Sequence, residues 1–113
     1  MIKLIYSDNG TPISDFQAQH FIDSAIASNN ADTTTVLHVA NEPVLTAMVL
    51  ALMNNKISED QVQLFYFDTE IKFNPFYGLE EVKGFENIGT NLPMTEQILK
   101  IGFENIKKRN QSK

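Results

Sequence analysis

The spacing of apolar residues predicts that short strands and helices alternate along most of the chain. Apolar or β-branched runs at residues 2–6, 33–39 and 62–67 have the length and composition of strands. Between them, apolar residues recur every three or four positions over residues 18–26 and 44–53, which is the spacing of an amphipathic helix. Strands that alternate with helices across short connections indicate an α/β fold with a small, mainly parallel sheet and right-handed crossovers.

The ends of these two helices carry capping signals. Ser14, followed three residues later by Gln17, fits a capping box at the start of the first helix, and Asn29-Asn30 suits its end. Asn41 is a candidate N-cap for the second helix. Apolar residues cover more than one side of that second helix, so we expect it to be packed on two sides or against a partner.

The pattern weakens in the last third of the chain. Residues 71–73 and 79–82 are candidates for an edge hairpin. Helical spacing then returns and predicts a C-terminal helix over residues 95–108. We therefore predict a single domain over residues 1–113, in which helices flank a βαβαβ core and residues 109–113 form a flexible tail.

Composition and charge narrow the function classes. The chain has no cysteine, which excludes disulfides, thiolate metal sites and cysteine nucleophiles. Its net charge is −5, with its basic residues concentrated near the C-terminus, so most of the surface would repel a phosphate backbone. No apolar run approaches the roughly 20 residues of a membrane span, and no signal-peptide pattern is present. We expect a cytoplasmic protein with neither a nucleic-acid nor a membrane partner.

Candidate ligand-binding residues gather after the first two strands. Asp8, Asn9 and Gly10 follow the first strand, while His38 and Asn41 lie at the end of the second. The carboxyl ends of parallel strands meet at the edge where α/β sheets bind ligands, so these five residues are candidates for a ligand site. However, Asp-Asn-Gly is also ordinary turn sequence, and a lone histidine in a strand is more often packed than catalytic. We favour the structural roles.

The sequence contains no motif for a metal site or for a catalytic serine nucleophile. His20, His38 and Asp8 match no short-range zinc spacing, and no Gly-x-Ser-x-Gly surrounds a serine. We predict no catalytic residues, no metal site and no cofactor, and we do not expect an enzyme.

Aromatic and aliphatic residues suggest a contact surface instead. Phe73, Phe76 and Tyr77 lie in a proline-containing segment that is a candidate exposed loop, and aromatic side chains are common anchors at protein interfaces. Met48 and Leu52 belong to the strongly apolar second helix, where a domain this small has little surface to cover them. These five residues are our interface candidates, with packing in the core as the alternative.

A family resemblance centres on "NKISEDQVQLFYFD", residues 55–68. This segment resembles the one that follows the switch histidine in the carboxy-terminal part of AAA/ABC-type ATPases of the overcoming-lysogenization-defect and related predicted-ATPase families. Without gaps, "LIYSDNGTPISDFQ" (residues 4–17) stands at the Walker B strand and its helix, and "VANEPVL" (residues 39–45) at the switch-histidine segment. The resemblance covers nearly the whole chain and implies an ATPase-like α/β fold.

The chain departs from that family at the positions that carry the chemistry. In the same alignment Tyr6 and Ser7 replace the two Walker B acids, and Ala40 replaces the switch histidine. No Gly-x-x-x-x-Gly-Lys-[Ser/Thr] motif is present to cradle phosphates. The resemblance therefore implies a degenerate ATPase-like domain without nucleotide hydrolysis.

Three hypotheses follow. The favoured one is a non-catalytic interaction or regulatory module that associates with itself or with a protein partner. A second is a split ATPase fragment that completes a nucleotide site with a partner bearing the P-loop. A third is a small ligand-binding protein or enzyme that uses the carboxyl edge of the sheet.

Overall fold

The computed structural model describes residues 1–30, 32–75, 78–79 and 92–111. The α/β class predicted from the sequence is confirmed. Along the chain the elements are β1 (Ile2–Thr11), the short 3₁₀ turn η1 (Asp15–Gln17), α1 (Ala18–Ala27), β2 (Thr35–Val39), α2 (Glu42–Met53), η2 (Glu59–Gln61), β3 (Val62–Tyr66), β4 (Thr69–Ile71), β5 (Phe73–Asn74), β6 (Gly78–Leu79) and α3 (Leu92–Gln111).

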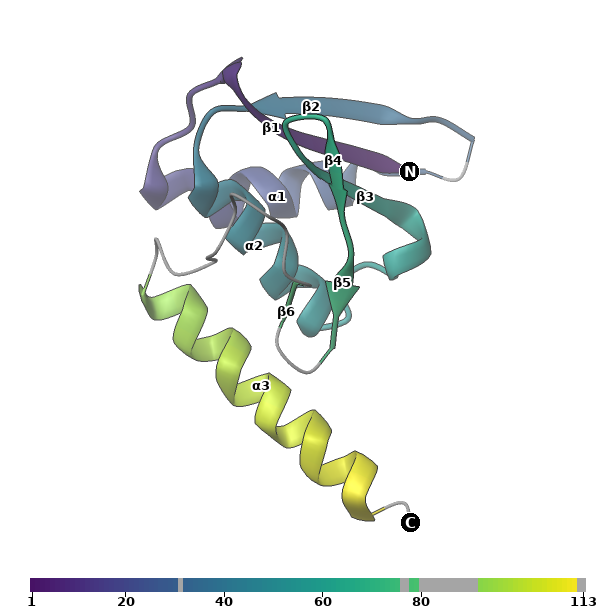
Figure 1. The fold of residues 1–113 in the computed structure, drawn as a ribbon. Helices are drawn as coiled ribbons and strands as arrows, with labels where there is room; N and C mark the ends of the chain where they lie inside the picture. Colours follow the sequence, from purple (N-terminus) through teal and green to yellow (C-terminus); the bar gives the residue numbers. More distant parts are fainter. Residues whose placement is uncertain (31, 76–77, 80–91, 112–113) are drawn as a thin grey trace.

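The main sheet has the strand order β2-β1-β3-β4 (Figure 1). Central β1 runs parallel to both neighbours, with Leu4 in register with Leu37 of β2 and with Leu64 of β3. Strand β4 is antiparallel to β3 and forms one edge, and β5 pairs with β6 in a separate small hairpin. The mainly parallel sheet is therefore as predicted; of the predicted hairpin, residues 80–82 lie outside the described residues.

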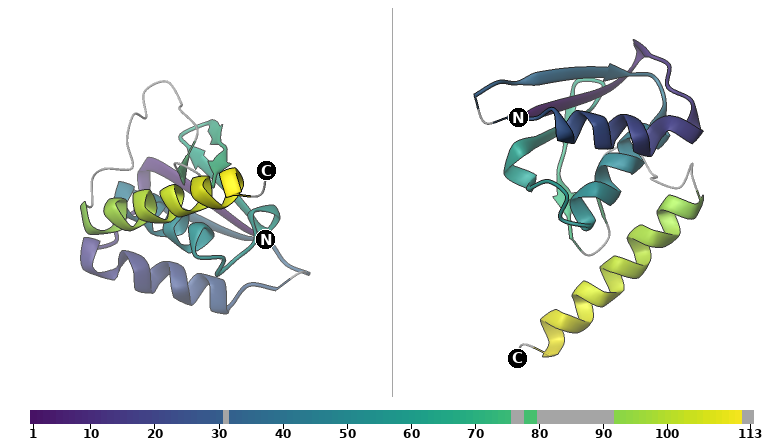
Figure 2. Two further views of the ribbon diagram at one scale, coloured as in Figure 1. Left: turned by 90° about the horizontal axis from the view of Figure 1, so that it is seen from below. Right: turned by 180° about the vertical axis from the view of Figure 1, so that it is seen from behind.

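One face of the sheet holds the hydrophobic core. Ile2, Leu4, Val39, Leu64 and Ile71 alternate onto this face and are all buried. Helices α1, α2 and α3 all lie on the same side, as the views in Figures 1 and 2 show. No described helix lies over the opposite face.

The one-sided arrangement comes from the hands of the two crossovers. Strands β2 and β3 lie on opposite sides of β1, so two right-handed crossovers would place α1 and α2 on opposite faces of the sheet. Instead the two helices pack against each other on one face. The crossovers therefore have opposite hands, and the expectation that both would be right-handed is wrong. As a consequence, none of the described helices covers the other face of this mainly parallel sheet.

Helix α2 is the centre of the core. Every residue from Pro43 to Met53 is buried, because the sheet, α1 and α3 surround the helix. The hydroxyl of Thr46, the buried polar residue of this helix, donates a hydrogen bond of 3.4 Å to the Glu42 carbonyl oxygen. The predicted packing on two sides is confirmed, which explains why apolar residues run around the whole helix.

Helix α2 ends in a Schellman motif. Asn55 adopts a left-handed conformation with φ of 59°. The Lys56 N–H donates to the Ala51 carbonyl oxygen at 2.9 Å, and the Asn55 N–H donates to that of Leu52 at 3.1 Å. This pair of bonds reverses the chain and directs it through η2 into β3.

Helix α1 begins differently from the sequence prediction. Ser14 opens the turn η1, in which the Gln17 N–H donates to the Ser14 carbonyl oxygen at 2.9 Å, and α1 starts only at Ala18. No side-chain cap is formed at Gln17, so the predicted capping box is absent. At the other end, Asn30 does not terminate α1 in a left-handed conformation, and its side-chain oxygen accepts the Asp32 N–H at 2.9 Å.

Helix α3 forms a third layer below α2. Met94 and Ile98 are buried against the core, and the Asn105 side-chain amide donates to the Pro75 carbonyl oxygen at 2.7 Å. The helix continues well past the body of the molecule to Gln111 (Figure 1). Leu99 and Phe103, which helical spacing alone groups with Ile98, are 47% and 64% exposed.

Candidate functional site

The five ligand-site candidates do lie near the carboxyl ends of β1 and β2, but they do not converge. Asp8, Asn9 and His38 are exposed. Within the described residues, no hydrogen bond or ion pair joins His38 to Asp8 or Asn9. The structure therefore does not assemble these three side chains into a site.

Gly10 serves the backbone rather than a ligand. A Cβ atom at this position would lie only 2.2 Å from the carbonyl carbon of Val39, so the chain passes directly across β2 here. Beyond this crossing, the Ala40 N–H donates to the Thr11 carbonyl oxygen at 3.1 Å. The N–H groups of successive residues in a strand point alternately to its two edges. The Thr35 N–H points towards β1, where it bonds to Met1, so the Ala40 N–H, an odd number of residues later, points to the opposite edge. Thr11, which accepts this bond, therefore lies on the outer edge of β2.

The outer part of β1, residues 7–11, is therefore an arm that crosses β2 and covers the end of its free edge. We call it the β1 arm. Shielding of an edge strand in this way prevents unwanted pairing with other chains. The sequence predicted an ordinary turn at Asp8-Asn9-Gly10, whereas the structure places these residues in extended chain.

Asn41 also has a structural partner. It occupies the N-cap position of α2, but its side chain makes no capping bond to that helix. Instead its Oδ1 atom accepts the Ile13 N–H at 2.8 Å, which ties the chain after the β1 arm to the start of α2. This hydrogen bond gives the Oδ1 atom of Asn41 a structural role.

Three aromatic rings meet at the carboxyl ends of β1 and β3. Tyr6 stacks on Tyr66 with ring centroids 5.2 Å apart, and Phe67 contacts both rings edge-on at 5.7 Å and 4.7 Å. Phe67 is the first residue of the two-residue turn between β3 and β4, and its φ is 55°. A bulky residue in the left-handed region is strained, so the ring contacts hold a conformation that the backbone alone would avoid.

Tyr6 is the described group whose protonation the fold clearly changes. Burial raises the pKa of its hydroxyl above 10.0, and the negative charge of Glu42, together with Tyr66 and Asp8, raises it further. The shift moves the pKa of this phenol further above physiological pH, at which an ordinary tyrosine is also neutral.

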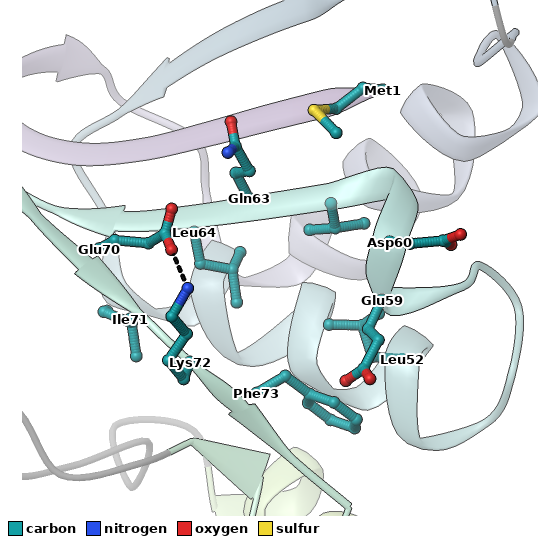
Figure 3. A pocket seen from close by; sticks show the side chains of 11 residues that line it. Met1, Leu52, Glu59, Asp60, Gln63, Leu64, Glu70, Ile71, Lys72 and Phe73 are labelled. Atoms are coloured by element: carbon teal, nitrogen blue, oxygen red, sulfur yellow. Dashed lines mark hydrogen bonds and ion pairs between the residues drawn. The ribbon is translucent and has the colours of Figure 1, made fainter.

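A groove of about 540 Å³ opens at the other end of the sheet, where the chain after β4 diverges from β3 (Figure 3). Its floor includes Leu52 and Phe73, and Glu59, Asp60 and Glu70 supply carboxylates around it. Figure 3 shows Glu70 paired with Lys72 beside this groove. A second groove of about 390 Å³ shares Leu52, Glu59 and Phe73 with the first.

The five interface candidates differ in how far the structure exposes them. Phe73 is partly buried and lines both grooves, and Leu52, although 4% exposed, also lines both. Met48 is fully buried in α2 and therefore belongs to the core rather than to a contact surface. Phe76 and Tyr77 lie outside the described residues.

The side of the sheet that no described helix covers is a surface that sequence reasoning missed. We call it the open face; it comprises the side chains that alternate away from the helices: Lys3, Ile5, Val36, His38, Gln63, Phe65 and Glu70. Val36 is 49% exposed, and the Lys3 ammonium lies 5.0 Å from the centre of the Phe65 ring. Both faces of residues 62–67 are mostly apolar, which suggests a strand buried on both sides, and the polar Gln63 on the second face was the signal against it.

The described residues hold no group of three histidine, aspartate or glutamate side chains placed to bind a metal ion. None of their helices combines the length and the apolar composition needed to cross a membrane. The fold and these surfaces define a layered α/β protein with one open sheet face. Comparisons with protein-family models, with curated proteins and with solved structures find no match for this chain.

Proposed function

We propose that this chain is a non-catalytic interaction module that binds an amphipathic helix of a partner protein on its open face. One observation carries the proposal: a mainly parallel sheet has all its described helices on one side. Such sheets are almost always covered on both faces. A partner helix would supply the missing layer.

The apolar residues of the open face match the width of one helix. Val36 on β2, Ile5 on β1 and Phe65 on β3 lie on three adjacent strands. Three adjacent strands span about 10 Å, which is close to the diameter of an α-helix. Lys3 borders this apolar strip, so an acidic residue beside the apolar stripe of the partner helix would find a positively charged neighbour.

The same chemistry argues against hydrolysis of a nucleotide. Gly10 and Asn41 are committed to backbone contacts, and Tyr6 is held in an aromatic cluster. We retain the degenerate ATPase-like origin as part of the proposal, supported by the βαβαβ order of the elements and by the motif resemblance. A titration of the full chain with Mg-ATP should give no heat of binding, and micromolar binding would contradict the non-catalytic assignment.

A display library of amphipathic helical peptides tests the open face directly. We expect the full chain to enrich peptides with apolar residues at three- and four-residue spacing, and NMR shift changes on binding should map to Ile5, Val36 and Phe65. A Val36→Glu variant should weaken binding at least tenfold, because it places a charge in the apolar strip. Phe16→Ser is the control, since Phe16 is 99% exposed and lies outside the open face.

The control variant should bind the selected peptides as the wild type does. Failure to enrich any helical peptide, or peptides whose binding is unchanged by Val36→Glu, would refute the proposal.

A further inference from the structure

Helix α3 has two apolar stripes, of which the core uses one. The first stripe contains Met94 and Ile98, which are buried against the body of the protein. The second stripe contains Leu99, Phe103 and Ile106, at spacings of four and three residues. Leu99 is 47% and Phe103 is 64% exposed, so two large apolar side chains stand next to each other in solvent.

The two stripes point in different directions around the helix. With 3.6 residues per turn, the centre of the Leu99, Phe103 and Ile106 stripe lies more than a third of a turn away from the buried stripe. Helix α3 also extends beyond the body of the molecule, which leaves room for a second helix alongside it (Figure 1). Leu99 and Phe103 of the second stripe are therefore accessible while α3 remains docked on α2, and Ile106 is partly buried.

We propose that the second stripe is the interface of a homodimer, in which α3 of one copy packs antiparallel against α3 of a second copy. Apolar residues at alternating spacings of four and three form the seam of a helix pair. Antiparallel packing about a two-fold axis needs only one surface, because each copy presents the same stripe to the other.

The charges beside the stripe specify this antiparallel arrangement. Glu96 and Lys107 lie on the same flank of the stripe, near opposite ends, and both are exposed. An axis that crosses α3 between Ile101 and Gly102 places Glu96 of each copy opposite Lys107 of the other, and Leu99 beside Phe103. Antiparallel helices bring equivalent flanks together, so this pairing occurs twice, whereas in a parallel pair Glu96 and Lys107 of the two copies would lie at different heights along the seam and form neither contact.

The size of the second stripe determines how tightly we expect the two copies to bind. A seam of three apolar residues from each helix lies at or below the lower end of specific interfaces, so we expect a dissociation constant on the order of 10 µM. The contact is therefore reversible and depends on protein concentration.

Sedimentation equilibrium of the full chain over roughly 1 to 500 µM tests the dimer. We expect a reversible monomer–dimer equilibrium for the wild type. Phe103→Glu should give a monomer with unchanged thermal stability at low concentration, because Phe103 is mostly exposed in the single copy. The control Phe16→Ser removes an aromatic residue that is 99% exposed and does not belong to α3, and it should leave the dimer intact.

Charge exchange tests the orientation. Glu96→Lys and Lys107→Glu should each weaken dimerisation several-fold, and the double variant should recover most of the loss, because it restores opposite charges at both contacts. A wild type that stays monomeric, an open-ended series of larger assemblies, a dimer that survives Phe103→Glu, or a double variant weaker than either single variant would overturn the proposal.

This inference is independent of the function proposed for the open face. Val36→Glu should abolish binding of helical peptides and leave the dimer unchanged, while Phe103→Glu should do the reverse. Loss of both properties in either variant would show that α3 and the open face form one surface, which contradicts the α3 pairing.

Discussion

At the level of single residues, the carboxyl edge of the sheet depends on one close contact between two backbone segments and on one strained backbone conformation. Gly10 touches the backbone of Val39, and Phe67 turns the chain with a positive φ. Gly10 lies near the end of β1, where the sequence suggests a turn or a ligand site, and Phe67 directly follows β3, where the sequence suggests a continuing strand. In the structure they instead determine how neighbouring strands fit together.

Because Gly10 contacts the backbone of Val39, we predict that adding a single methyl group at this position strongly destabilises the fold. We expect Gly10→Ala to lower the free energy of unfolding by at least about 2 kcal/mol, because the new Cβ would collide with main-chain atoms that cannot rotate away. Urea denaturation measures the change. The control Asn9→Ala, at an exposed neighbouring position, should change stability by less than about 0.5 kcal/mol. Equal stabilities of Gly10→Ala and wild type would show that the β1 arm does not cross β2.

The positive φ of Phe67 leads us to predict an unusual order of stability among variants at this position. Both Phe67→Ala and Phe67→Gly lose the ring contacts with Tyr6 and Tyr66, but only glycine relieves the positive φ. We expect the glycine variant to be more stable than the alanine variant by about 1 kcal/mol in thermal or urea unfolding. The opposite order would mean that the turn conformation is not strained.

Tyr6 predicts a loss of stability at alkaline pH. Its pKa is raised above 10.0 in the folded protein, so the folded state holds this proton more tightly than the unfolded state does. The stabilising effect is complete below the unfolded pKa and is lost as the pH rises through the folded pKa. Urea unfolding between pH 8 and pH 11 should show a steeper decline for wild type than for Tyr6→Phe. Parallel curves for the two proteins would contradict the shift.

At the level of elements, regular periodicity predicted most of what the structure contains. The strands at the start, middle and end of the βαβαβ unit, the buried α2 and the C-terminal helix follow from local spacing, and their bounds shift by only a few residues. The β3–β4 turn was missed because Phe67-Asp68 carries no glycine or asparagine signal. The side of the sheet on which α1 packs depends on long-range contacts, so local patterns did not reveal the open face.

The end of α2 gives a prediction at this scale. Asn55 occupies the left-handed position of the Schellman motif, whereas the preceding Asn54 has a φ of −85°. Asn55→Gly should raise the free energy of unfolding by up to about 1 kcal/mol, since glycine adopts this conformation without strain. Asn54→Gly is the matched control and should be neutral or destabilising. Chemical denaturation of both variants measures the difference, and a gain at Asn54 alone would contradict the motif.

At the level of the whole molecule, the third layer should fold together with the rest. Ile98 of α3 is fully buried against the core, so Ile98→Ala should destabilise the entire protein by about 3 kcal/mol in one cooperative transition. Leu99→Ala, one residue further, should cost less than about 1 kcal/mol at concentrations that favour the monomer. Far-ultraviolet circular dichroism and tyrosine fluorescence should report the same midpoint. A separate early transition for α3 would contradict this coupling.

The β1 arm also constrains the order in which the chain can fold. Strand β2 has β1 on one edge and Thr11 on the other, with Gly10 pressed against Val39 where the chain crosses between them. The arm closes over a strand that must already be in place, so its closure is a late event and its opening an early step of unfolding. The amide hydrogen of Ala40, which bonds to Thr11, should then exchange with solvent before those between β1 and β3.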